Sequence, residues 1–80
     1  MPRYFLDIVN DGTVEDPDGA DFADLEAARE EAILSARDLI SQDLKEGRPL
    51  GLKRRIQIRD ETGQAIDSVS FFEVIPPDRQ

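Results

Sequence analysis

Hydrophobic and polar positions alternate along residues 3–9, and this period of two predicts a β-strand. Its wholly apolar face carries Tyr4, Leu6 and Ile8. Asn10-Asp11-Gly12 follows, and these residue types accept the backbone angles of a tight turn. We therefore expect the chain to reverse here and residues 13–15 to pair back as a short second strand, which Pro17 prevents from continuing.

A stripe of apolar residues at three- and four-residue steps predicts one amphipathic helix. Asp24 is the expected N-cap, because its carboxylate can accept the free backbone N–H groups of the first turn. Gly47 is the expected C-terminal stop, and Pro49 supports it. The stripe consists of Leu25, Ala28, Ala32, Ile33, Ala36, Leu39, Ile40 and Leu44.

The period of two returns at residues 52–59, where Leu52, Ile56 and Ile58 are expected to face inward. Residues 60–63 then form a four-residue turn that ends in Gly63, a residue suited to the left-handed backbone region. These features predict a third strand and the turn of a second hairpin.

Residues 66–74 read as the returning strand, but its register is ambiguous. Val69 and Phe71 lie on one face, whereas Ile66, Phe72 and Val74 lie on the other. We favour Val69 and Phe71 as the core set.

The whole pattern predicts an α+β fold of order β-β-α-β-β, in which a small antiparallel sheet of two hairpins carries one amphipathic helix on one face. We expect residues 1–75 to form a single domain and residues 76–80 to form a disordered tail. Because one helix cannot cover both faces of a sheet, we expect the other face to be exposed and to carry Phe5 together with Phe72.

The order and spacing of four short motifs resemble a family of short uncharacterised proteins from rhizobia and related alpha-proteobacteria, described as a domain of unknown function. The resemblance extends from Arg3 to about Phe72 and implies a bacterial cytoplasmic protein, but it carries no activity and no catalytic residues. The motifs are Pro2-Arg3-Tyr4-Phe5, Asp11-Gly12, Leu25-Glu26-Ala27-Ala28-Arg29 and Arg59-Asp60-Glu61-Thr62-Gly63.

The composition of the chain limits which catalytic and metal-binding side chains it can offer. The 80 residues include no histidine and no cysteine, which removes the usual general base and the commonest zinc ligands. A domain this small also has little room for an enclosed pocket. We therefore expect no enzyme activity, no cofactor and no metal.

No apolar run approaches the roughly 18 residues that span a bilayer. The first residues lead directly into strand-like sequence without a signal-peptide pattern. We expect a cytoplasmic protein that does not enter membranes.

The chain has a formal net charge of −8, and its charged residues are unevenly distributed along the sequence. Residues 1–28 hold eight acidic side chains against Arg3 alone, and residues 45–59 hold six basic side chains against Glu46. Asp16, Asp18 and Asp21 could serve as oxygen ligands of a cation, but their spacing does not fit an EF-hand loop. A solvated loop whose aspartates favour turns explains them more simply.

Lys53, Arg55 and Arg59 on the third strand suggest an alternative function, association with nucleic acid through phosphate contacts. The acidic net charge argues against nucleic acid as a partner. Basic residues that guard an exposed strand against aggregation explain the same pattern.

The favoured function is that of a small non-catalytic protein-interaction or regulatory module. Opposite charges could steer it onto an unidentified protein partner or onto another copy of itself. The predicted interaction surface comprises Phe5, Phe72, Lys53, Arg55 and Arg59.

Overall fold

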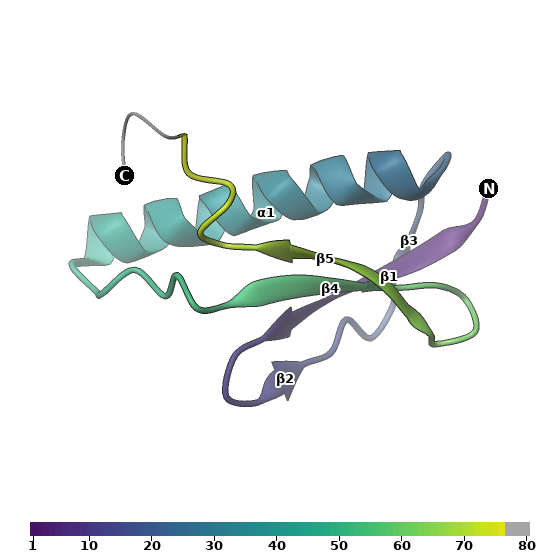
Figure 1. Ribbon diagram of the computed structural model, residues 1–80, viewed down its shortest axis with the longest axis horizontal. Coiled ribbons are helices and arrows are strands. Elements are labelled where there is room, and N and C mark those ends of the chain that lie inside the picture. Colours follow the sequence, from purple (N-terminus) through teal and green to yellow (C-terminus); the bar gives the residue numbers. More distant parts are fainter. Residues whose placement is uncertain (77–80) are drawn as a thin grey trace.

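In the computed structural model, which describes residues 1–76, one long helix lies across one face of an antiparallel sheet (Figure 1). The predicted α+β order is confirmed, with one addition, a two-residue strand just before the helix. The predicted tail falls largely on residues 77–80, which lie outside the described residues. The elements are β1 (Arg3–Val9), β2 (Thr13–Val14), β3 (Ala20–Asp21), α1 (Leu25–Glu46), β4 (Arg55–Arg59) and β5 (Ala65–Ser70).

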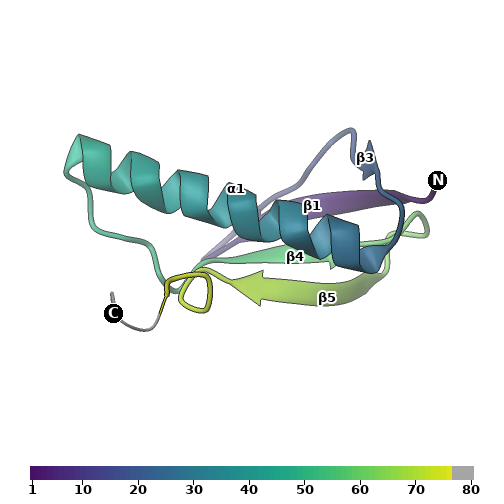
Figure 2. The ribbon, with the colours of Figure 1, turned by 90° about the horizontal axis from the view of Figure 1, so that it is seen from above.

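The sheet has the order β2-β1-β4-β5, and β3 pairs with the first residues of β1. The N-terminal strand is therefore interior, since β1 pairs along its length with β4, from Phe5 opposite Arg59 to Val9 opposite Arg55. Seen from above, α1 runs over β1, β4 and β5 (Figure 2). This pairing joins the acidic first hairpin directly to β4, the basic strand predicted as the third.

Local chemistry sets both ends of α1 as predicted. The Asp24 carboxylate accepts the Ala27 N–H at 2.9 Å, and Gly47 ends the helix with a φ of 70°. Small side chains bring the helix close to the sheet, because Ala28, Ala32 and Ala36 are fully buried. No helix within residues 1–76 is both long and apolar enough to cross a membrane.

The predicted burial of Leu44 is wrong. Its side chain is 65% exposed, and the neighbouring Asp43 is buried instead. The reason is electrostatic, because two arginines reach Asp43 at the end of the helix.

Both strands of the second hairpin are shorter than predicted. Residues 50–54 form turns, in which the Leu52 N–H donates to the Leu50 carbonyl at 2.8 Å, so β4 begins at Arg55 rather than at Leu52. The chain also turns after Ser70, and this turn brings Val74 into the core beside Val69 and Phe71. The predicted core residues Ile56, Ile58, Val69 and Phe71 are confirmed, each no more than 1% exposed.

Candidate interaction site

The sheet face opposite α1 is organised around a buried ion pair. Asp7 is 1% exposed and accepts a hydrogen bond from Nη2 of Arg59 at 3.0 Å, with a second bond from Nε of Arg59. The Arg59 guanidinium also lies 4.9 Å from the centre of the Phe5 ring. Burial raises the pKa of Asp7, but the bonds from Arg59 and from the Asp16 N–H outweigh it, so the pKa of Asp7 is lowered. Arg59 is therefore engaged within the protein.

The loop of residues 15–19 folds over this pair. The Asp16 N–H donates to Asp7 at 2.9 Å, and the Asp16 carboxylate accepts the N–H groups of Leu6 and Gly19 at 3.2 and 3.0 Å. Burial raises the pKa of Asp16, but these N–H donors outweigh it and lower the pKa. Gly19 lies so close to Phe5 that an added Cβ would be 2.8 Å from the ring. The far face is thus partly covered, which differs from the expected bare face.

The same bonds bear on the cation-site alternative. The Asp16 carboxylate is occupied by backbone donors, whereas Asp18 is exposed and Asp21 pairs with Arg3 at 3.3 Å. Within residues 1–76 no group of three histidine, cysteine, aspartate or glutamate side chains is placed to hold a metal ion.

The structure does not gather the five residues of the predicted interaction surface. Phe5 is half-buried opposite Arg59, whereas Phe72 is 52% exposed in the turn beyond the other end of the β4–β5 ladder. Lys53 and Arg55 are exposed near the Phe72 end. Phe5 and Phe72 therefore do not form one apolar patch.

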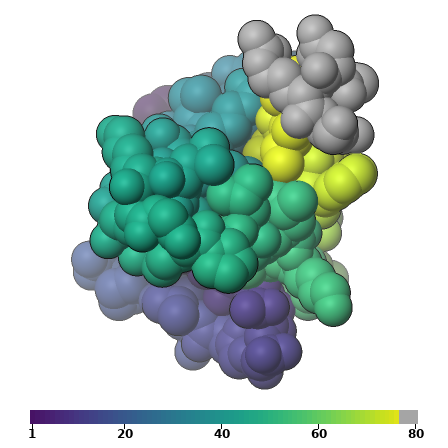
Figure 3. Space-filling view, turned by 90° about the vertical axis from the view of Figure 1, so that its left-hand side faces the viewer, coloured from purple at the N-terminus to yellow at the C-terminus, as the bar shows by residue number. Residues whose placement is uncertain are grey.

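The basic residues at the C-terminal end of α1 are partly neutralised by Asp43. Arg48 donates to its Oδ1 at 3.0 Å and Arg54 to its Oδ2, while the Arg54 guanidinium lies 4.4 Å from the Phe71 ring centre. The hydrogen bond from Arg48, helped by Arg54, lowers the pKa of Asp43 despite its burial. This end of the molecule is formed by the helix end and the loop after it, between the first hairpin and the C-terminal turn (Figure 3). These pairings engage Arg48 and Arg54, whereas Lys53 and Arg55 form no ion pair within residues 1–76.

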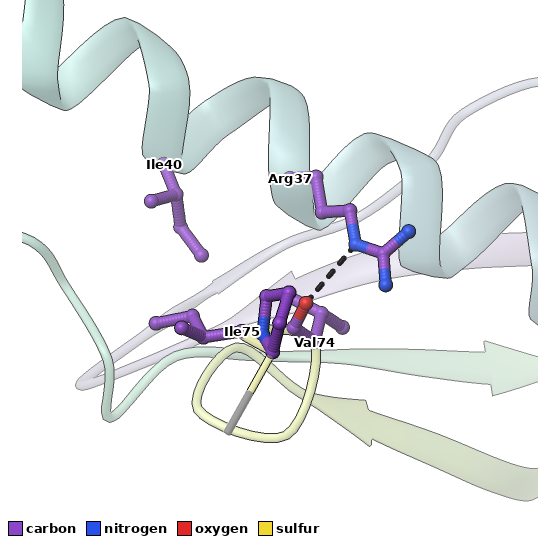
Figure 4. A pocket seen from close by; sticks show the side chains of 5 residues that line it. Arg37, Ile40, Val74 and Ile75 are labelled. Atoms are coloured by element: carbon purple, nitrogen blue, oxygen red, sulfur yellow. Dashed lines mark hydrogen bonds between the residues drawn. The ribbon is translucent and has the colours of Figure 1, made fainter. Parts of the chain in front are cut away.

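A hollow of about 420 Å³ lies between α1 and the turn that follows β5. Arg37 and Ile40 line it from the helix, and Val74, Ile75 and Pro76 line it from the turn. Figure 4 shows Arg37 reaching to the Val74 carbonyl, which accepts a hydrogen bond from Nε at 3.0 Å. This contact holds the arginine at the mouth of an otherwise apolar hollow.

A second hollow of about 320 Å³ adjoins the first along the helix and shares Arg37 with it. Its other lining residues, Glu30, Ile33 and Leu34, belong to the same flank of α1, because residues three, four and seven apart lie on one side of a helix. Leu34 is 54% exposed. We call the two hollows together the helix groove, lined by Glu30, Ile33, Leu34, Arg37, Ile40, Val74, Ile75 and Pro76.

The sequence pattern does not predict this groove. Ile33 and Ile40 belong to the predicted buried stripe, Arg37 belongs to the polar face opposite it, and Leu34 has no predicted role. A signal was present in Leu34, an apolar residue outside the stripe, but the opposite wall comes from residues 74–76, which were predicted to be a strand end and a tail.

Comparison with known proteins identifies a family but no function. Residues 3–73 match the family described as a domain of unknown function, DUF6894. No curated protein and no solved structure is significantly similar to the chain. The match covers most of the chain, including every helix and strand described above. The chain therefore belongs to the DUF6894 family.

Proposed function

We propose that this protein is a non-catalytic protein-interaction module that binds an amphipathic helix of a partner in the helix groove. The observation that carries the proposal is the continuity of the groove, in which exposed Leu34 and half-buried Ile33 and Ile75 adjoin one another across two hollows. Contiguous exposed apolar surface of this kind is typical of interaction sites. A groove beside a helix suits a second helix that presents apolar residues at three- and four-residue spacing.

The charges of the groove support binding with a defined orientation. Glu30 and Arg37 are both exposed and lie on either side of Ile33 and Leu34. The bond to the Val74 carbonyl already orders Arg37, so less side-chain entropy is lost when an acidic group binds it. Complementary charges on a partner helix would fix its orientation in the groove and raise its association rate.

The same geometry supports a non-catalytic role. Glu30 and Arg37 are the ionisable side chains of the groove. Seven residues along a helix place their backbones about 10 Å apart, so they do not converge on one reacting atom. The groove offers contact area and two separated charges, which are properties of a binding surface.

Site-specific photo-crosslinking in the native host tests the proposal. A photoreactive residue at position 34 should give a discrete protein adduct, whereas one at Val14, 69% exposed on β2, should not. Mass spectrometry then identifies the adduct and the crosslinked segment.

The decisive step uses the identified segment as a purified peptide. Leu34→Glu should abolish its binding, and Val14→Glu should leave it unchanged. Identical adducts at the two positions, no adduct at position 34, or a peptide that binds both variants equally would each overturn the proposal.

A further inference from the structure

We infer that the amphipathic helix in the helix groove is α1 of a second copy of this chain, packed antiparallel about a two-fold axis. This inference rests on the proposed function and names its partner. Its basis is the order of side chains on one helix flank, where an acidic residue, an apolar pair and a basic residue follow one another as Glu30, Ile33-Leu34 and Arg37.

That order is self-complementary. A two-fold axis between Ile33 and Leu34 places Leu34 of each copy against Ile33 of the other. The same axis places Glu30 of each copy opposite Arg37 of the other, because both residues lie at equal separation from the axis. Closed two-fold dimers require such a surface, in which one patch matches itself.

Neither charge has a counter-ion among residues 1–76 of its own copy. Within residues 1–76 neither Glu30 nor Arg37 forms an ion pair, and Nε of Arg37 donates a hydrogen bond to the Val74 carbonyl. The residues three and four positions from each charge on α1 supply no counter-ion. They are Glu26, Ala27, Ile33 and Leu34 for Glu30, and Ile33, Leu34, Ile40 and Ser41 for Arg37. A second copy supplies both counter-ions at once.

Other antiparallel registers fit less well. An axis at Arg37 would bring the two Arg37 guanidinium groups together. An axis near Leu39 would place Leu34 against Leu44 and Glu30 against Arg48, but Arg48 already pairs with Asp43 and Glu46 at 3.0 and 2.8 Å. The register centred between Ile33 and Leu34 is therefore the one that satisfies unpaired charges.

The dimer should be weak. The groove is small compared with stable interfaces, and two copies that each carry a net charge of −8 repel one another. Association is accordingly expected in the micromolar to millimolar range, with monomer and dimer in rapid exchange.

Sedimentation velocity across a concentration series tests the dimer directly. The 9.0 kDa chain should shift toward twice its mass as concentration rises. Leu34→Glu should remain monomeric throughout, whereas the matched variant Leu44→Glu, on an exposed residue of the same helix, should associate like the wild type. Circular dichroism verifies that both variants fold, which is expected because both leucines are more than half exposed.

Charge reversal tests the register. Glu30→Arg and Arg37→Glu should each weaken association about tenfold, because each opposes like charges, and the double variant should recover to within about threefold of wild type. Arg37→Glu also removes the bond to Val74, but so does the double variant, so recovery reports on the pairing between copies.

The outcomes separate this inference from the proposed function. A wild-type monomer at every concentration overturns the second-copy inference, while a crosslink at position 34 to a different protein would leave the groove as a binding site. A dimer that tolerates Leu34→Glu uses another surface and also overturns it. Loss of association in Leu44→Glu would contradict the register, and so would failure of the double variant to recover.

Discussion

Asp7 on β1 and Arg59 on β4 form a buried ion pair across adjacent strands, although they are 52 positions apart in the sequence. The pair lies on the sheet face opposite α1 and is covered by the loop that contains Asp16. It joins the acidic N-terminal segment to the basic strand β4. The charge asymmetry of the sequence is thus partly neutralised inside the fold.

Replacement of Asp7 should destabilise the protein more than a surface aspartate would. Asp7→Asn should lower the free energy of unfolding by about 3 kcal/mol. This value is at the low end for removing one partner of a buried pair, because Arg59 keeps some contact with solvent and lies near Glu15. The exposed Asp38→Asn should cost less than about 0.5 kcal/mol. Urea denaturation measures both, and equal losses would contradict a structural role for the pair.

Acid should weaken the fold below about pH 4. The pKa of Asp7 is lowered from 3.8 because bonds from Arg59 outweigh its burial, and that of Asp43 is lowered by Arg48 and Arg54. A carboxyl group with a lowered folded-state pKa contributes stability that is complete above its unfolded-state pKa and is lost as pH falls through its folded-state pKa.

Unfolding free energies measured from neutral pH downward check this expectation. They should be flat while the pH stays above the unfolded-state pKa and should fall below it, and no histidine titrates in the flat region. Asp7→Asn should show a shallower decline. An unchanged slope in this variant would rule out Asp7 as a contributor.

Gly19→Ala should lower the free energy of unfolding more than the same substitution at a glycine that has a positive φ but open space around it. Gly19 has a φ of +68°, and an added Cβ would lie 2.8 Å from both Phe5 Cε2 and the Tyr4 carbonyl oxygen. The expected loss is about 3 kcal/mol. Gly63→Ala is the control, since its φ is +87° but its Cβ would meet nothing within 4 Å, and it should cost about 1 kcal/mol. Similar thermal shifts in the two variants would show that the loop does not press on Phe5.

At the end of α1, replacing the polar residue Asp43 should destabilise the protein more than replacing the adjacent apolar residue Leu44. Leu44→Ala should change the free energy of unfolding by less than about 0.5 kcal/mol because Leu44 is 65% exposed. Asp43→Ala should cost about 2 kcal/mol because it leaves Arg54 without its carboxylate. Chemical denaturation of the two variants is sufficient, and a larger loss in Leu44→Ala would contradict the structure.

The free edge of β5 should be protected from strand pairing by side chains. Arg29 donates to the Ser68 carbonyl at 3.1 Å, and Glu73 accepts the Ser70 N–H at 2.8 Å. These bonds occupy backbone groups that another strand would otherwise pair with. The double variant Arg29→Ala/Glu73→Ala should aggregate sooner than wild type, as measured by light scattering below the unfolding transition.

The matched control for this experiment is Lys45→Ala/Glu46→Ala, which removes the same charges from exposed residues at the end of α1. It should aggregate at the wild-type rate. Equal acceleration in both variants would attribute the effect to surface charge and not to the strand edge.

Features that depend on neighbouring residues were predictable. The ends of α1 follow from Asp24 and Gly47, and the last hairpin turn ends in Gly63 with a φ of +87° as expected. The inward set of β4 follows from the alternation of Ile56 and Ile58. In each case the stabilising contact lies within a few residues or follows from the period of the element.

The burial predictions were wrong where contacts outside the local pattern decide which side chain is buried. Val74 reaches the core because the chain turns after β5, and Asp43 displaces Leu44 because Arg48 and Arg54 converge on it. Hydrophobicity alone ranks Asp43 and Leu44 wrongly, since a paired carboxylate can be buried at the end of a helix.

The sequence by itself determined the α+β class, the capped helix and the second hairpin, because caps, turns and periodicity are encoded by residues close together in the chain. Only the tertiary structure decided that β1 is interior, that Asp7 meets Arg59, and that α1 and residues 74–76 form the helix groove. Each of these depends on contacts between segments far apart in the sequence, which local pattern does not specify.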